Sequence, residues 1–154
     1  MATSIQVVFD CADPDRLARF WAGALHCVIQ PPPAGYGSWD AFLEATHVPR
    51  EDWNAASAVV DPEGKGPRLY FQQMDTPKPA KNRLHLDLNV GGGGKVPLEE
   101  RKAKVEAEVT RLLGLGATLL VPWEEQVRGL QPWEAQGEYW VVMADTEGNE
   151  FCVQ

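Results

Sequence analysis

The chain lacks the features of a secreted or membrane-embedded protein. It has only three cysteines in 154 residues, Cys11, Cys27 and Cys152, and they form no CxxC pair. Widely spaced cysteines in odd number are typical of thiols in a reducing compartment. No stretch approaches the ~18 consecutive apolar residues of a membrane-spanning helix. The opening residues, MATSIQVVFD, also lack the basic segment and long apolar run of a signal peptide. These absences predict a cytoplasmic protein without a membrane partner.

Positive charge is also scarce. The 14 Lys and Arg residues against 22 Asp and Glu residues give a formal net charge of −8. An acidic chain is repelled by nucleic acid and by anionic membranes, so we expect neither as a partner. The hydrophobic fraction of 44% is ordinary and suits one domain with a real core.

The first half of the chain predicts a strand, a helix and three further strands. Residues 4–11 are rich in β-forming side chains, and Asp13 and Pro14 then form a typical helix start. The remaining elements are a strand in HCVIQ, a short helix near Trp39–Glu44, and strands in AVVDPEG and PRLYFQQM with a turn at Asp61–Gly64. Trp21 lies on the apolar face of the first helix and is predicted to be core, whereas His26 and His47 are predicted to face solvent.

The same order begins again after a basic link, DTPKPAKN. RLHLDLNV alternates strictly and predicts a strand, a long helix ends at Gly114 or Gly116, and ATLLVPW and EYWVVMADTEGNEFCVQ predict three more strands. VVDPEG at Val59–Gly64 is echoed by VMADTEG at Val142–Gly148. Duplication explains the order and the echo, and chance similarity of two turns is the alternative. The sequence therefore predicts one α+β domain, residues 1–154, made of two βαβββ modules at about 1–78 and 79–154.

Each module has one helix, which covers one face of its sheet and leaves the other face open. Two open faces turned toward each other would give a cupped mixed sheet around a central cleft. Side chains alternate between the two faces of a strand. Leu84, Leu86 and Leu88 are predicted to face the helix, so the residues between such helix-facing positions are predicted to face the cleft. The predicted cleft-facing residues are Gln6, Val8, Asp10, Arg68, Tyr70, Gln72, His85, Asp87, Asn89, Glu150, Cys152 and Gln154.

Three segments resemble a known family: FDCADPDRLARFWAGAL, NRLHLDLNV and WVVMADTEGNEFCV. They are similar to glyoxalase-like domains of the vicinal oxygen chelate superfamily, which includes glyoxalase I, bleomycin-resistance proteins and extradiol dioxygenases. The resemblance covers almost the whole chain. It implies paired βαβββ modules, in agreement with the order above, and a homodimer.

The resemblance also implies a site for one divalent metal ion. In metal-using members four cleft positions hold the ion; in this chain three of them fall on Gln6, His85 and Glu150. The fourth falls on Arg68 or Tyr70, neither of which is a usual ligand. Amide, imidazole and carboxylate donors suit Zn, Ni, Mn or Fe. Glu150 would double as the catalytic base, which implies a metal-assisted lyase or isomerase for a small oxygen-rich substrate.

The alternative is a metal-free protein that binds a small molecule, as bleomycin-resistance proteins do. Arg68 would then bind a carboxylate or phosphate of the ligand, or would pair with Glu150. Tyr70, Asp87 and Trp39 complete the predicted substrate-binding set. Trp39 would stack on a flat ligand or fill a hydrophobic gap. The same two interpretations apply to Trp53, Trp123 and Trp133. The sequence leaves open whether the protein is an enzyme.

Overall fold

The structure is a computed structural model that describes residues 6–78, 80, 82, 84–92, 95–126, 128 and 139–154. The chain divides into two compact units, Met1–Pro77 (unit 1) and Lys78–Gln154 (unit 2), so the division falls inside the basic link DTPKPAKN. The prediction that both belong to one domain with a shared cleft stays a prediction.

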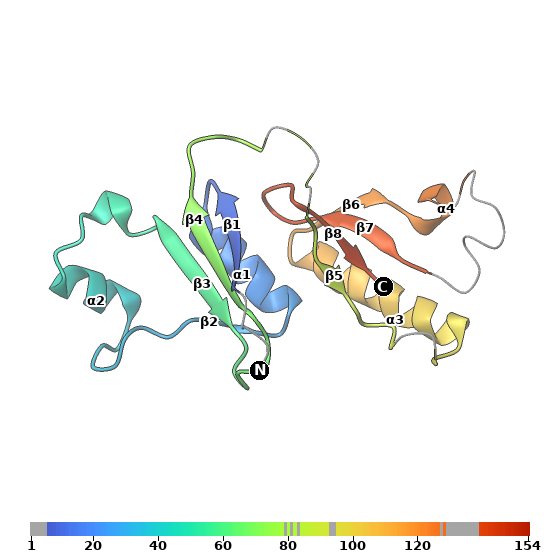
Figure 1. Cartoon of the computed structure of the whole chain (residues 1–154), viewed down its shortest axis with the longest axis horizontal. Helices are drawn as coiled ribbons and strands as arrows, with labels where there is room; N and C mark the ends of the chain where they lie inside the picture. Colours follow the sequence, from blue (N-terminus) through green and yellow to red (C-terminus); the bar gives the residue numbers. More distant parts are fainter. Residues whose placement is uncertain are drawn as a thin grey trace. The chain divides into compact units, whose positions relative to one another are not determined.

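Unit 1 is a four-stranded mixed sheet with one long helix (Figure 1). The sheet order is β1-β4-β3-β2, with β1 parallel to β4 and the other pairs antiparallel. The elements are β1 (Gln6–Cys11), α1 (Pro14–Ala24), β2 (Val28–Ile29), α2 (Trp39–Ala45), the 3₁₀ turn η1 (Arg50–Asp52), β3 (Ala56–Val60) and β4 (Arg68–Gln73).

Helix α1 starts where the sequence predicts. The Asp13 side chain accepts a hydrogen bond of 3.2 Å from the backbone N–H of Arg16, and Pro14 is the first helical residue. Trp21 is only 1% exposed. Its ring lies 5.4 Å from that of Phe9, which stacks at 5.2 Å on Phe71. Aromatic packing between α1 and the sheet therefore forms the core of unit 1, and the prediction for Trp21 is confirmed.

Unit 2 repeats this arrangement with the sheet order β5-β8-β7-β6. Its elements are β5 (Asp87–Leu88), α3 (Leu98–Gly114), β6 (Thr118–Val121), α4 (Trp123–Gln126), β7 (Val141–Ala144) and β8 (Glu150–Val153). Gly116 follows α3 with a φ of +101°, a left-handed conformation that suits glycine at a helix end. Trp133 and most of the polar connection around it lie outside the described residues. The predicted α+β fold of two βαβββ modules is confirmed.

The strand predicted for RLHLDLNV is much shorter than its alternation suggests. Only Asp87 and Leu88 pair with β8, and Leu84, expected to pack on the helix, is 72% exposed. The reason lies at the start of β8. There the carboxylate of Glu150 accepts a hydrogen bond of 2.9 Å from the backbone N–H of Asn82, and its carbonyl accepts one of 3.4 Å from the Asn82 side chain. Asn82 is therefore held to β8 by side-chain contacts and not by a strand ladder.

Strand pairing allows the residues of the paired strands in the two units to be matched. Tyr70 pairs with Ala58 in unit 1, and Cys152 pairs with Val142 in unit 2. This register makes Asp61 the counterpart of Asp145. Both carboxylates accept a hydrogen bond from the backbone N–H two residues later, at 2.8 and 2.9 Å. The repeated turn supports duplication over chance similarity.

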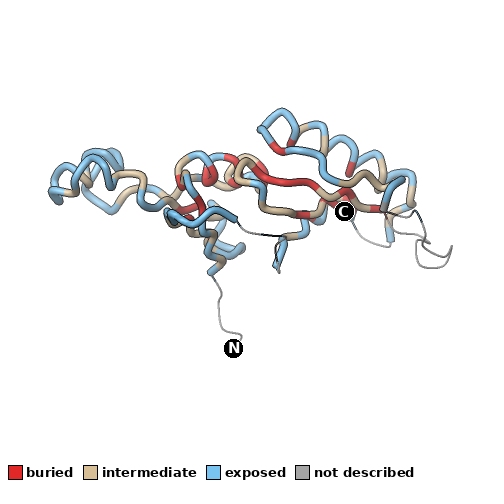
Figure 2. The backbone as a smooth tube through the Cα atoms, turned by 90° about the horizontal axis from the view of Figure 1, so that it is seen from above, coloured by how far each residue is buried: buried red, intermediate tan, exposed pale blue. Residues whose placement is uncertain are grey.

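The helix-facing side chains carry the burial in both units. Leu69 and Phe71 of β4 and Phe151 and Val153 of β8 are at most 2% exposed, while the residues between them are half-buried (Figure 2). This alternation confirms the predicted division of both strands into a core face and an open face. His26 and His47 are exposed, as predicted. Among the described residues, no helix is both long and apolar enough to cross a membrane.

Candidate functional site

Unit 1 contains a pocket of about 740 Å³ on its own residues. The open face of β3 and β4 contributes to its wall, and so do α2 and the start of α1. Its apolar and aromatic lining includes Ile29, Trp39, Leu43, Trp53 and Tyr70, and Arg68 is also part of the wall. This volume lies within the range of sites for small organic molecules.

Arg68 is held in a fixed orientation by two amide side chains. Its Nε donates a hydrogen bond to Oε1 of Gln30, and its Nη1 donates one to Oε1 of Gln6, both at 2.6 Å. Gln6 and Arg68 are also Cα partners in the β1–β4 ladder, so the sheet sets them side by side. The guanidinium carbon lies 5.0 Å from the ring centre of Tyr70. These contacts fix the planar group in place before any ligand binds.

The charge of Arg68 is not neutralised by an acid in the described part of the chain. Its two hydrogen-bond acceptors are neutral amides, and none of the ion pairs between described residues includes it. A half-buried guanidinium of this kind is a ready binding group for a carboxylate or phosphate, which it can contact with two parallel hydrogen bonds.

Trp39 is connected to Arg68 through Gln30. The indole Nε1 of Trp39 donates a hydrogen bond of 2.7 Å to the backbone carbonyl of Gln30. Ser38 caps α2 by accepting a hydrogen bond from the N–H of Ala41 at 3.1 Å, which places Trp39 at the first helical position. Trp39 remains 36% exposed, so it can contact a ligand.

Four aspartates also line the pocket, and two of them have clear structural partners. Asp13 accepts a hydrogen bond from the Asn54 side chain at 2.8 Å, which lowers the pKa of Asp13 together with the N–H of Arg16. Asp15 forms an ion pair of 2.8 Å with Arg19. The other two are Asp40, in the first turn of α2, and Asp52, the last residue of η1. The pocket therefore combines one anion-binding group with an acidic lining.

Glu150, on the open face of unit 2, is held by its neighbours. Its Oε1 lies 3.1 Å from the ammonium of Lys78, and its Oε2 accepts a hydrogen bond of 2.9 Å from the backbone N–H of Asn82. Burial raises the pKa of Glu150, but the N–H of Asn82 and the charge of Lys78 together lower it by more, so the net pKa lies below its usual range. A carboxylate stabilised in this way is a weaker base than an ordinary glutamate.

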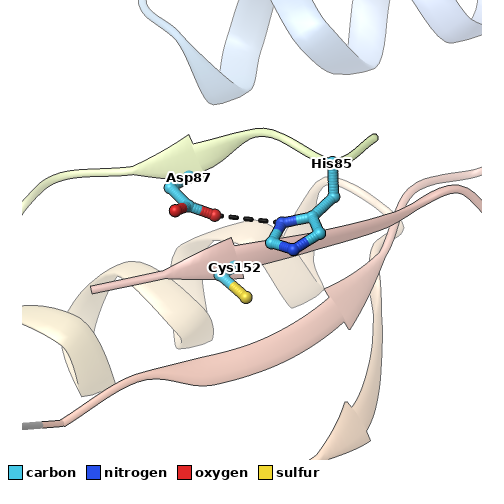
Figure 3. Close-up of side chains that lie close together, drawn as sticks. All are labelled: His85, Asp87 and Cys152. Carbon is cyan, nitrogen blue, oxygen red and sulfur yellow. Dashed lines mark ion pairs between the residues drawn. The ribbon is translucent and has the colours of Figure 1, made fainter. Parts of the chain in front are cut away.

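His85, Asp87 and Cys152 lie together on the open face of unit 2 (Figure 3). His85 Nδ1 lies 3.0 Å from Asp87 Oδ1. Each of the three residues offers one potential ligand atom, and these atoms all lie within 4.8 Å of one another. The sequence placed His85 and Asp87 on this face but gave Cys152 no role beyond a thiol there.

Two members of the ligand set implied by the resemblance are already in contact with positive side chains. Gln6 Oε1 already accepts a hydrogen bond from the guanidinium of Arg68, and Glu150 already pairs with Lys78. A cation at either oxygen would meet a positive side chain within hydrogen-bond distance. Gln6 lies in unit 1, whereas His85 and Glu150 lie in unit 2. The metal role of Gln6 and Glu150 and the catalytic role of Glu150 stay predictions.

Sequence reasoning missed three residues that shape these sites: Gln30, Lys78 and Asn82. Gln30 follows the strand Val28–Ile29, and the alternation of HCVIQ could have placed it on the same face as Val28. Lys78 and Asn82 belong to the link between the modules, and no local pattern there indicates a contact with Glu150.

The arrangement of strands and helices is shared with several solved structures. A mutant of the fosfomycin resistance protein FosX from Listeria monocytogenes, complexed with Mn(II) and 1S,2S-dihydroxypropylphosphonic acid, is 11% identical; the alignment covers 100% of this chain and 92% of that chain, with a TM-score of 0.57. A possible glyoxalase from Bacillus cereus is 12% identical over 100% of this chain and 99% of that chain, with a TM-score of 0.56. Identities this low show the fold alone. None of the curated proteins compared with the chain matches it.

The fold and these neighbours define a protein built of two βαβββ modules. The model of one family, described as the glyoxalase-like domain, matches residues 6–154. The chain belongs to this glyoxalase-like family, as the resemblance in its sequence implies.

Proposed function

We propose that this glyoxalase-like protein binds a small organic anion with an apolar or aromatic part, in the pocket of unit 1. The observation that carries the proposal is Arg68, a cation oriented by two amides at 2.6 Å beside the aromatic ring of Tyr70. Trp39 and Leu43 supply apolar lining in the same pocket. The ligand's anionic oxygens would contact Arg68, and its apolar part would contact the aromatic lining.

The acidic lining limits the charge of this ligand. In the described part of the chain, four aspartates line the pocket together with two arginines: Asp13, Asp15, Asp40 and Asp52 with Arg19 and Arg68. Because like charges repel at short range, a monoanion should bind better than a polyanion. Hydroxyl or amino groups on the ligand would be favoured near the aspartates, which accept hydrogen bonds.

The test uses simple probes in isothermal titration calorimetry. Benzoate combines an aromatic ring with one negative charge, acetate lacks the ring, and benzyl alcohol lacks the charge. We expect benzoate to bind more tightly than either of the others. Arg68→Met should weaken benzoate binding by roughly 10- to 100-fold, because a hydrogen bond to a charged group contributes about 1.5–3 kcal/mol. Phenylphosphonate tests whether a second charge weakens binding.

Arg19→Met is the matched control. Arg19 lines the same pocket but pairs with Asp15, and its side chain is 69% exposed. This variant should bind benzoate about as well as the original chain. Equal binding by Arg68→Met, or equal losses from both arginine variants, would remove Arg68 from the site and contradict the proposal.

A metal-assisted lyase or isomerase is the second candidate. It is favoured by the FosX neighbour complexed with Mn(II) and by the position of His85 on the open face of unit 2. Elemental analysis of chain purified without chelator, repeated on His85→Ala and Glu150→Ala, tests it. Metal lost in both variants would support this candidate, and metal absent even after addition of Zn, Ni, Mn or Fe would reject it. The predicted homodimer is a separate proposal, which light scattering at micromolar concentration tests.

A further inference from the structure

We infer that His85, Asp87 and Cys152 form a metal site within unit 2, for a borderline divalent cation such as Zn²⁺. One potential ligand atom from each of the three residues lies within 4.8 Å of the other two (Figure 3). The set shares His85 with the ligands that the resemblance implies, but it replaces Gln6 and Glu150 with Asp87 and Cys152. All of its residues belong to one unit.

The β5–β8 ladder brings the three side chains together. Asp87 and Cys152 are Cα partners in this parallel pair, so their side chains leave the sheet on the same face. His85 precedes Asp87 by two residues and points to that face as well. The opposite face is closed, since Leu88 and Val153, the next pair along the ladder, are buried. Strand register thus brings Asp87 and Cys152 together, and His85 joins them from the segment just before β5.

The distances between the potential ligand atoms are close to those around a tetrahedrally coordinated ion. Zinc bonds of about 2.0–2.3 Å place neighbouring ligand atoms roughly 3.3–3.6 Å apart. His85 Nδ1 and Asp87 Oδ1 are 3.0 Å apart, and the sulfur of Cys152 lies within 4.8 Å of one ring nitrogen of His85 and one carboxylate oxygen of Asp87. A side-chain adjustment of about 1 Å would complete the geometry.

The donor types select the class of metal. Imidazole, carboxylate and thiolate together suit Zn²⁺, whereas Mg²⁺ and Ca²⁺ prefer sites made only of oxygen. Three protein ligands leave a fourth tetrahedral position for water or for a ligand atom. The side chains of His85 and Asp87 are 39% and 42% exposed, so an ion can reach them.

Gln154 acts as a positioning residue for the site. Its Nε2 donates a hydrogen bond of 3.3 Å to Asp87 Oδ2 and one of 3.0 Å to Asn89 Oδ1. The contact engages the carboxylate oxygen that faces away from His85 and leaves Asp87 Oδ1 toward the ion. Partners of this kind orient metal ligands and raise affinity.

The experiment measures metal binding to the untagged full chain. Zn²⁺ is titrated in competition with a chromophoric chelator, and Co²⁺ serves as a spectroscopic probe. We expect one ion per chain and a thiolate-to-cobalt charge-transfer band. Cys152→Ser should abolish that band and weaken Zn²⁺ binding by roughly 100-fold or more, since even an outer partner of a ligand contributes about 10- to 100-fold. Gln154→Ala should leave the band and weaken binding by about tenfold.

Two control variants test whether the ion binds at Cys152 and not at another thiol or carboxylate. Cys27→Ser removes another half-buried thiol, from unit 1, and should leave both signals unchanged. Glu150→Gln removes a ligand of the set implied by the resemblance, and should also leave them unchanged. A band that survives Cys152→Ser, or that disappears in Glu150→Gln, would overturn the inference.

Alkylation of the original chain gives a readout that needs no variant. Zn²⁺ should protect Cys152, but not Cys27, from iodoacetamide, as measured by mass spectrometry of the digested chain. Equal labelling of Cys152 with and without Zn²⁺ would reject the site. Because Arg68 and this cluster belong to different units, either proposal can fail while the other holds.

Discussion

The two units have the same fold but different chemistry on their open faces. Strand order, the parallel pair and the aspartate turn agree between them. On the core face of β4 and β8, apolar Leu69 and Phe71 correspond to apolar Phe151 and Val153. On the open face, the register makes Arg68 the counterpart of Glu150, with opposite charge. The helix-facing half of each strand therefore maintains the fold, and the other half is available for function.

Each unit also stabilises its own open-face charge. In unit 1 the amides of Gln6 and Gln30 hold the guanidinium of Arg68. In unit 2 Lys78 and the backbone of Asn82 hold the carboxylate of Glu150. Arg68 and Glu150, which have opposite charges at matched positions, are therefore each stabilised by partners in their own unit. Among the described residues, unit 1 presents a cation that forms no ion pair with an acid, whereas unit 2 presents an acid that is already paired.

The largest effect is expected from replacing one core phenylalanine in each unit. Phe71 and Phe151 are 0% and 1% exposed, each on an interior strand. Phe71→Ala and Phe151→Ala should each lower the free energy of unfolding by about 3–5 kcal/mol, because both leave a cavity under the helix. Urea denaturation measures the loss, and hydrogen exchange of peptides from each unit locates it.

Val8→Ala is the control for this pair, since Val8 is 49% exposed on the open face of unit 1 and should cost little. A loss below about 1 kcal/mol for only one of the two phenylalanines would show that the units do not rely equally on their cores.

A smaller difference is expected at the matched turns. Asp145 is 3% exposed and accepts hydrogen bonds from the backbone N–H groups of Glu147 and Asn149, each at 2.9 Å. Asp145→Ala should therefore lower the free energy of unfolding by roughly 1.5–3 kcal/mol. Asp61→Ala removes similar hydrogen bonds from a more exposed turn, so its loss should be clearly smaller.

Thermal and urea unfolding compare these two variants. Asp145→Asn, which keeps one acceptor oxygen, should recover part of the stability. Equal losses at Asp61 and Asp145 would mean that burial does not distinguish the two turns.

Local signals in the sequence were enough for most of the fold. The Asp13–Pro14 helix start and the buried Trp21 follow from residues adjacent in the chain, and strand alternation places Arg68 on the open face. Alternation does not say how far a partner strand extends, which is why the strand around Asp87 was predicted too long.

The contacts that define the candidate sites were less accessible to sequence reasoning. The bond between Arg68 and Gln30 joins residues 38 positions apart, and the bond between Glu150 and Lys78 spans 72. A polar side chain in a connecting segment has many possible partners, and only the folded backbone selects one. Cys152 acquires its neighbour Asp87 through strand register, and His85 from the segment just before β5, so the cluster emerges only when β5 and β8 pair.

The smallest expected effect is a pH dependence that Glu150 contributes and its counterpart Arg68 does not. The pKa of Glu150 is lower in the folded chain than its usual value, so the unfolded state binds this proton more tightly. The stabilisation is therefore fully present above the ordinary glutamate pKa of about 4.3 and is lost as the pH falls through the folded value. Its size should be at most about 1 kcal/mol, as for an exposed ion pair.

The matched variants for this test are Glu150→Gln and Arg68→Met, with the free energy of unfolding measured from neutral pH down through the carboxylate range. Glu150→Gln should flatten the acid dependence relative to the original chain. Arg68→Met should leave its slope unchanged, because a guanidinium stays protonated throughout. If Glu150→Gln retained the full slope, the contacts with Lys78 and Asn82 would not stabilise the charged carboxylate, and Glu150 would again be available as a base or a ligand.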